Sequence, residues 1–297
     1  METPLGVAQP NLDALNRRYE AATAGRRRRF YWLMAGVALA ASLSSWVAEV
    51  DLGLLWRKGD GFFSYFQRIF TFDSGDLRGK SVFSDPAEWF WGLKKWLLLL
   101  LDTLLIAFLG TLLGTLGALS LCFAAARNLT PNRWVASLTK RALEFCRTVP
   151  EVVFALIFVI AFGLGPLPGV LALALHSMGA LGKLFAETAE NIDPKPIDGV
   201  TAAGGNWTQI VAFAAMPQVI SVFVSNSLLR FEINVRSASV MGFVGAGGIG
   251  QTLLEAIRKF YYADVSAILM LILATVMLID GASGWLRRRL LDAGKAA

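Results

Sequence analysis

The sequence predicts an all-α protein that crosses a membrane about six times. Of its 297 residues, 55% are hydrophobic and only 17% are charged, whereas a soluble domain usually carries about 25% charged residues. Several apolar runs also reach the roughly 17–25 residues that a helix needs to cross about 30 Å of hydrocarbon. The composition therefore favours a polytopic helical membrane protein over a soluble domain.

Six apolar stretches are the predicted membrane spans. They cover residues 30–48, 97–123, 149–165, 167–187, 218–242 and 265–286. The third and fourth spans are short and share the turn GLGPLPG, whose glycines and prolines end both helices. The first span is interpreted as an uncleaved anchor, because its apolar run of about 19 residues exceeds the usual 7–15 of a signal peptide.

Basic residues are unevenly distributed between the two predicted sides of the membrane. Seventeen Lys and Arg residues fall on the side that holds both termini, against nine on the other. Because cytoplasmic loops are enriched in Lys and Arg, both termini are predicted to be cytoplasmic. The net charge of +6 then indicates contact with anionic membrane lipid rather than nucleic acid. The aromatic-rich segment 49–96 falls outside and is expected to lie against the lipid headgroups.

Two short motifs resemble nucleotide sites but lack the surroundings that those sites need. Gly245, Gly247 and Gly250 match the G-x-G-x-x-G fingerprint, which requires a parallel sheet, and an apolar helical pattern follows them instead. The stretch SGDLRGKS ends like a P-loop, but Ser74 stands where that motif needs glycine. One His and two Cys leave no metal-ligand cluster. The chain is therefore expected to bind no metal and no nucleotide itself.

The fifth predicted span carries polar side chains near mid-bilayer. They are Asn226, Arg230, Glu232, Asn234 and Arg236. Such residues are costly in lipid unless they face a bundle interior or a solute path. Glu232 and Arg236 can pair on one helix face, whereas Arg230 shares a donor-rich face with Asn226 and Asn234 that suits an anion. Pairing of Arg230 with an acid on another helix is the alternative. His176, in the fourth span, is either a hydrogen-bonded interior residue or part of the path.

Residues 193–217, between the fourth and fifth spans, are too many and too apolar for an ordinary turn. Asp193 followed by proline predicts a helix start, and Gly204 with Gly205 divides the segment into two short helices before Pro217 opens the next span. Two short helices on the cytoplasmic face suit docking in the groove of a partner protein. A loop packed only on its own bundle is the alternative.

This segment resembles the cytoplasmic coupling motif of ABC importer permeases, in which an acid and two small residues precede a glycine and an apolar-x-apolar-Pro ending. The matching residues are Asp198, Gly199, Val200, Gly204, Ala214, Met216 and Pro217. Glu, Ala-Ala, Ile and Leu are the commoner choices at several of these positions. The stretches FCRTVPEVVFALIFVIAFGLGPLPGVLAL, HSMGALGKLFAE and RFEINVRSASVMGFVGAGGIGQTLLEAIR together resemble the phosphonate-importer branch, over roughly residues 97–290.

The resemblance implies a permease core at residues 97–290 with its coupling loop at 193–217, a cytoplasmic segment at 1–29 and a cytoplasmic tail at 291–297. It implies a multi-pass homodimer of the bacterial inner membrane that docks on a cytoplasmic ABC ATPase dimer, which would hold ATP and Mg. A periplasmic solute-binding protein would deliver phosphonate or a related phosphorus oxyanion, such as phosphite, hypophosphite or a phosphate ester.

Two further expectations accompany this resemblance. The glycines Gly245, Gly247, Gly248 and Gly250 would let helices approach closely or flex near the outer gate. The chain is expected to be a transport subunit rather than an enzyme. An ion-coupled secondary anion transporter is the alternative, because it too would need charges inside the membrane.

Overall fold

The computed structural model describes residues 12–49, 52–73 and 77–296, most of which lie in helices. The first eleven residues of the predicted segment 1–29, Ser74 of the P-loop-like stretch and the last residue of the tail fall outside this range. Within the described residues there is no β-strand, only an isolated bridge between Thr71 and Ser81. The predicted all-α class is confirmed.

The chain divides into two units, one up to Ser64 and the other from Tyr65 to Ala297. The first unit contains α1 (Leu12–Val47), in which Gly25–Val47 is long and apolar enough to cross a membrane. It also contains most of α2 (Leu52–Ile69), on which the exposed aromatic side chains of Trp56, Phe63 and Phe66 share one face. A helix with such a face suits the boundary between lipid and water.

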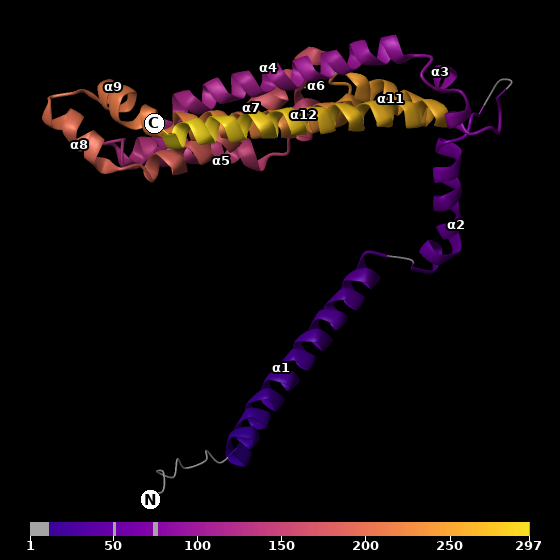
Figure 1. Cartoon of the computed structure of the whole chain (residues 1–297), viewed down its shortest axis with the longest axis horizontal. Helices are drawn as coiled ribbons and strands as arrows, with labels where there is room; N and C mark the ends of the chain where they lie inside the picture. Colours follow the sequence, from indigo (N-terminus) through magenta and orange to yellow (C-terminus); the bar gives the residue numbers. More distant parts are fainter. Residues whose placement is uncertain (1–11, 50–51, 74–76, 297) are drawn as a thin grey trace, which may run out of the picture. The chain divides into compact units, whose positions relative to one another are not determined.

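The second unit is a bundle of long helices. Its long helices are α4 (Leu93–Ala125), α5 (Arg133–Thr148), α6 (Glu151–Phe162), α7 (Pro166–Glu190), α10 (Met216–Met241) and α12 (Tyr262–Ala296). Its shorter helices are α3 (Pro86–Trp89), α8 (Pro194–Ala202), α9 (Trp207–Gln209) and α11 (Ile249–Arg258). The helix α4 packs along α7, and α12 packs along α10. Figure 1 shows α8 and α9 at one end of the bundle and α3 and α11 toward the other.

The described residues hold five helices that are long and apolar enough to span a membrane, or six if a bent pair counts as one span. The bent pair is α5 and α6, which meet at 86°. The prediction that residues 149–165 form a span by themselves is wrong, because α6 has 12 residues and is only about 18 Å long. Pro150, just before α6, lacks the amide hydrogen that would continue α5.

Small residues set the spacing within the bundle. A Cβ on Gly110 of α4 would lie 2.6 Å from the Cβ of Leu173 on α7, and one on Gly114 would lie 2.6 Å from the Cβ of Ser177. On the other side of α7, a Cβ on Gly179 would lie 2.6 Å from the backbone oxygen of Leu143 on α5. These glycines allow α7 to pack directly against both neighbours, as small residues do in membrane bundles.

The segment between α2 and α4 packs on the end of the bundle where α12 begins. The indole N–H of Trp89 donates to the hydroxyl of Ser266 on α12 at 3.0 Å, and Val82 is fully buried. A carboxylate oxygen of Asp73 accepts from the backbone N–H of Tyr262 at 2.7 Å and thereby caps the start of α12. Asp73, Val82 and Trp89 thus tie this segment to the bundle, whereas Phe83 and Trp91 are exposed. Its predicted place against the lipid headgroups stays a prediction.

Candidate functional site

Asn234 joins three helices at the centre of the bundle. Its side chain is fully buried, and its amide nitrogen donates to the hydroxyls of Thr111 on α4 and Ser177 on α7, each at 2.8 Å. Its carbonyl oxygen has no hydrogen-bond partner among the described residues. In this conformation the amide nitrogen of Asn234 is engaged in contacts between helices, and the place of Asn234 in a solute path stays a prediction.

Arg230 lies one turn before Asn234 on α10 and is partly buried. Its Nε donates to the same Ser177 hydroxyl at 3.1 Å. Its Nη2 is buried and makes no hydrogen bond to any described residue, and the guanidinium interacts electrostatically with Glu151 at the start of α6. Arg230 thus has an acid on a neighbouring helix, although no ion pair within 4 Å joins the two among the described residues, and it has a buried donor that an anion could use. Asn226, one turn further back, is partly buried.

Glu151 also connects the neighbouring helices. One of its carboxylate oxygens accepts from the hydroxyl of Ser237 on α10 at 2.7 Å, and the other lies 3.5 Å from the Nε2 of His176 on α7. The Nδ1 of His176 lies 3.0 Å from the backbone oxygen of Val149. His176 is therefore hydrogen-bonded within the bundle, and its ring lies beside the carboxylate of Glu151. We call Glu151, His176, Ser177, Arg230, Asn234 and Ser237, with Thr111, the central cluster.

Glu232 and Arg236 face away from the central cluster, toward α12. Arg236 lies 3.3 Å from a carboxylate oxygen of Glu232, one helical turn away, so the predicted pair is formed. The second oxygen of Glu232 lies 3.7 Å from Arg287 of α12. The side chain of Arg236 remains 52% exposed on this single chain. A half-exposed guanidinium on a helix of this kind needs water, a partner chain or lipid headgroups around it.

The glycine-rich turn between α10 and α11 brings backbones into contact. Gly245, Gly247 and Gly248 have φ values of 83°, 83° and 79°, which side chains rarely adopt. A Cβ on Gly250 would collide with the backbone oxygen of Ser239. The hydroxyl of Thr103 on α4 accepts from the backbone N–H of Ile249 at 2.9 Å and anchors the start of α11. The turn is thus tightly packed, while its role in an outer gate stays a prediction.

The predicted coupling loop forms α8 and α9 and leaves most of its surface exposed. The Asp193 side chain accepts a hydrogen bond from the backbone N–H of Lys195 and so caps the start of α8. The predicted break at Gly204 is confirmed, since its φ is +80°. Gly205 is followed by α9, which continues through a π-helical stretch, Ile210–Ala215, into α10 at Met216 and Pro217. The Gln218 side chain accepts from the Asp193 backbone N–H at 3.0 Å, which joins the two ends of the loop. Asp198 and Gly199 are exposed on α8.

Several members of the central cluster escaped the sequence analysis. Glu151 heads an apolar run directly after Pro150, and an acid in that position could have signalled a partner for a basic residue inside the membrane. Thr111, Ser177 and Ser237 carry no comparable signal, since isolated hydroxyls are common in membrane helices. Only the packing of α4, α7 and α10 reveals their role.

The chain matches a described family and named relatives. Residues 110–292 match the family described as binding-protein-dependent transport system inner membrane component. The phosphite transport system permease protein PtxC of Stutzerimonas stutzeri is 44% identical over 199 residues, which are 67% of this chain and 72% of that protein. The phosphate-import permease protein PhnE of Mycolicibacterium smegmatis is 41% identical over 199 residues, which are 67% of this chain and 37% of that protein.

A solved structure shares the fold. A chain in inward facing conformations of the MetNI methionine ABC transporter matches with a TM-score of 0.59 and 19% identity, over 69% of this chain and 98% of that chain. The predicted site residues, from His176 to Gly250, all fall inside the family match, whereas α1, α2 and α3 precede it. The predicted alternative, an ion-coupled secondary anion transporter, has no counterpart among these relatives.

Replacing Asn234 with alanine tests its structural role. We expect Asn234→Ala to lower the free energy of unfolding by about 1–3 kcal/mol, the typical cost of breaking buried hydrogen bonds. Thermal unfolding of the purified chain in detergent measures the effect. Asn226→Ala, on the same helix but only partly buried, is the matched control and should change the midpoint temperature of unfolding little. Equal midpoints for the two variants would show that Asn234 does not hold the bundle together.

Proposed function

This chain belongs to the family of binding-protein-dependent transport system inner membrane components, and we propose that it is the membrane subunit of an ATP-driven importer of phosphorus oxyanions. The observation that carries the proposal is Arg230, whose buried Nη2 lacks a hydrogen-bond partner among the described residues of a chain 44% identical to a phosphite permease. Guanidinium groups bind tetrahedral oxyanions well, because their donors form a planar fork. Phosphonate, phosphite, hypophosphite and phosphate esters all present such oxygens.

We propose that two copies of the chain form the transport path between them. Arg236 is half exposed, and Arg230, Glu151 and His176 are only partly buried on one chain. Charged groups at membrane depth are expensive in contact with lipid and normally face a protein interior or water. A second copy over this face would enclose them and would bring a second Arg230 toward the same path.

The energy source in this proposal is a separate pair of cytoplasmic ABC ATPases, which hold ATP and Mg while this chain binds neither. The exposed loop of α8 and α9 is the docking element, because an exposed short helix suits a groove on a partner. A periplasmic solute-binding protein delivers the oxyanion at the opposite end. Both termini are then cytoplasmic, as the distribution of Lys and Arg favours.

Substitution of Arg230 tests the proposed path. Uptake of phosphite or phosphonate by cells that contain the ATPase and binding protein should fall roughly 10–100-fold in Arg230→Ala, since a hydrogen bond to a charged group contributes about 1.5–3 kcal/mol. Arg230→Lys should keep part of the uptake, because charge is retained while the guanidinium fork is lost. Normal uptake by a well-expressed, correctly assembled Arg230→Ala variant would exclude the role.

Mass measurement of the purified complex should give two copies of this chain for two ATPases.

Gly204 tests the coupling loop. No atom outside its immediate neighbours lies within 4 Å of a Cβ at this position, so the cost of a side chain here is backbone strain at φ of +80°. Gly204→Val should therefore weaken co-purification with the ATPase and lower transport several-fold, because β-branched residues avoid this conformation. Gly204→Asn is the matched control, since Asn tolerates it better. Unimpaired transport by Gly204→Val would leave the loop as a self-packed element.

The orientation of the chain can be tested with cysteine labelling. Lys80→Cys, on the exposed outer segment, should react with an impermeant thiol reagent in intact spheroplasts. Thr201→Cys, exposed on α8, should react only after the membrane is opened. The parent chain is a suitable background, because its two cysteines, Cys122 and Cys146, are buried. The reverse pattern of labelling would overturn the proposed topology.

A further inference from the structure

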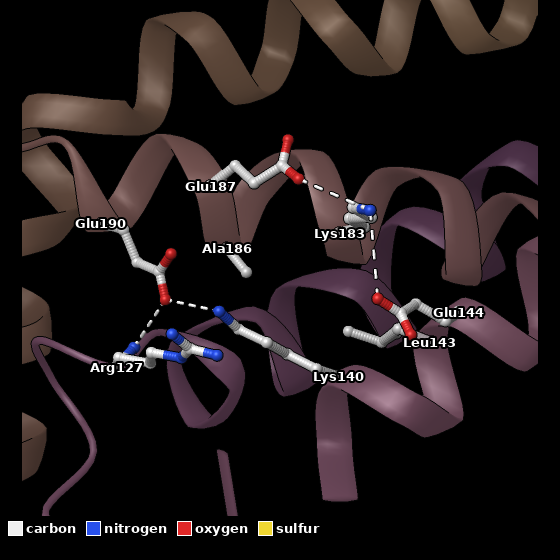
Figure 2. A pocket seen from close by; sticks show the side chains of 8 residues that line it. All are labelled: Arg127, Lys140, Leu143, Glu144, Lys183, Ala186, Glu187 and Glu190. Carbon is white, nitrogen blue, oxygen red and sulfur yellow. Dashed lines mark hydrogen bonds and ion pairs between the residues drawn. The ribbon is translucent and has the colours of Figure 1, made fainter. Parts of the chain in front are cut away.

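A charged cavity lies at the end of the bundle that carries α8 and α9. Its volume is about 220 Å³, and it is enclosed by the turn after α4, by α5 and by the last turns of α7. Three basic residues, Arg127, Lys140 and Lys183, and three acidic residues, Glu144, Glu187 and Glu190, line it (Figure 2). None of these residues belongs to the central cluster or to the predicted coupling motif.

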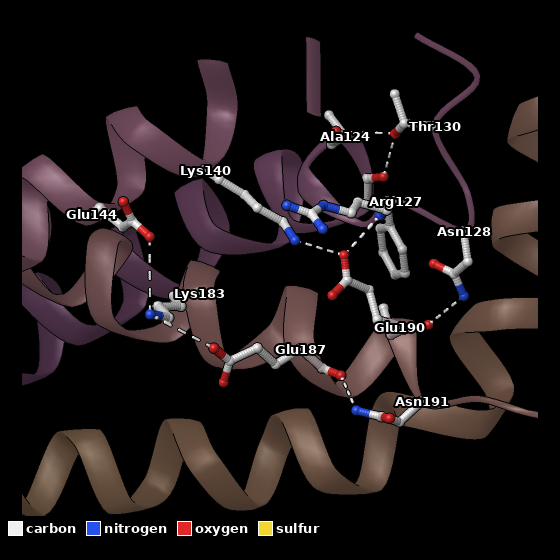
Figure 3. A network of polar contacts seen from close by, with 12 residues as sticks. Ala124, Arg127, Asn128, Thr130, Lys140, Glu144, Lys183, Glu187, Glu190 and Asn191 are labelled. Atoms are coloured by element: carbon white, nitrogen blue, oxygen red, sulfur yellow. Dashed lines mark hydrogen bonds and ion pairs between the residues drawn. The ribbon is translucent and has the colours of Figure 1, made fainter. Parts of the chain in front are cut away.

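One carboxylate in the cavity is held as a bound anion would be. An oxygen of Glu190 accepts from the ammonium of Lys140 at 2.7 Å and from the backbone N–H of Arg127 at 2.9 Å. Glu144 is engaged by Arg141, which lies one turn earlier on α5, at 2.5 Å. Figure 3 shows Glu190 reaching from the end of α7 between these donors. The site is thus preorganised for oxygen atoms that carry negative charge.

The basic residues, in contrast, keep unused donors. Lys183 lies 3.7 Å from Glu187 and 4.0 Å from Glu144, which are ion-pair distances too long for hydrogen bonds. The guanidinium of Arg127 makes no hydrogen bond to any residue in the described part of the chain. In both close-up views it lies beside the ammonium of Lys140 (Figures 2 and 3). Two like charges side by side are stabilised when an anion binds between them.

We propose that this cavity is a binding site for a phosphate group. Phosphate oxygens would take the free donors of Arg127 and Lys183 and would share or displace the contact of Lys140 with Glu190. A metal ion fits less well, because the described residues contain no group of three ligands placed to hold one. The volume is sufficient for a phosphate group with its water. This proposal does not rest on the transport of oxyanions through the central cluster.

The cavity is connected to the loop of α8 and α9. Beside Arg127, the side-chain amide of Asn128 donates to the backbone oxygen of Ala189 at 2.9 Å. The next residue, Leu129, accepts at its backbone oxygen from the indole N–H of Trp207 on α9 at 3.0 Å. An anion that competes with Glu190 would therefore loosen a segment that contacts α9 directly. Occupancy of the cavity would thus be sensed where the partner ATPase is proposed to dock.

Two sources could supply the phosphate group, namely free phosphate and the headgroup of an anionic lipid. Trp134 and Leu138 on α5 are exposed and share a face, which would suit acyl chains beside the cavity. The two sources are distinguished by presenting them separately. Inorganic phosphate is titrated into the delipidated full-length chain in neutral detergent by calorimetry. For the lipid source, the midpoint temperature of thermal unfolding is compared between vesicles of phosphatidylglycerol and vesicles of phosphatidylcholine.

Lys183→Gln is the principal variant, because the Lys183 ammonium makes no hydrogen bond within the described chain that its loss would break. We expect saturable phosphate binding, or a higher midpoint in phosphatidylglycerol vesicles, in the parent chain. Lys183→Gln should weaken phosphate binding at least tenfold, or abolish the lipid effect. The double variant Lys140→Gln with Glu190→Gln removes one charge of each sign. It should also weaken phosphate binding or reduce the lipid effect. Lys80→Gln, an exposed lysine on the outer segment, is the matched control and should change nothing.

Arg230→Ala separates this site from the proposed transport path. Phosphate binding that survives Arg230→Ala and is lost in Lys183→Gln supports the proposed phosphate site in the cavity. This holds whether or not the Arg230→Ala variant still takes up oxyanions. Binding to free phosphate identifies that source, whereas an effect of phosphatidylglycerol without phosphate binding identifies the lipid headgroup. Absence of both effects in the parent chain, or their persistence in Lys183→Gln, would overturn the proposal.

Discussion

The hydrogen bonds of Asn234 fix the orientation of α10 about its own axis, and much of the central structure depends on that orientation. A buried amide is costly unless it is hydrogen-bonded, and the donors of this one meet Thr111 and Ser177. Residues three and four positions apart on a helix share a face, so Arg230 falls beside the same Ser177. Glu232 and Arg236 are then directed toward α12, where Arg287 lies.

Close packing makes this arrangement possible. The hydroxyls that receive Asn234 stand on α4 and α7, and these two helices approach each other closely because Gly110 and Gly114 have no side chains. On its other side, α7 approaches α5 at Gly179, which brings the last turns of α7 beside the middle of α5 around the charged cavity. The same helix therefore supports a buried cluster within the bundle and a solvent-facing ion network at its end.

The two ends of the bundle are built differently. At the end where α12 begins, Trp89 and Asp73 tie the segment before α4 to that helix, so packed aromatic side chains cover this end. At the other end, Gln218 joins the base of an exposed loop whose helices have few contacts of their own. A firmly joined base with an exposed tip suits an element that transmits force from a partner to α10.

The sequence by itself determined the class of the protein, its helices and the break at Gly204, because apolar length, proline and glycine act locally along the chain. It also indicated which helix carries charge into the membrane. Only the tertiary structure brought Glu151 near Arg230, joined Asn234 to Thr111 and Ser177, and gathered Arg127, Lys140 and Glu190 around one cavity. These contacts join residues about 50 to 120 positions apart, as Lys140 and Glu190 or Asn234 and Thr111 show. Helical periodicity cannot report them, since it describes one helix at a time and the packing of small residues chooses the neighbour.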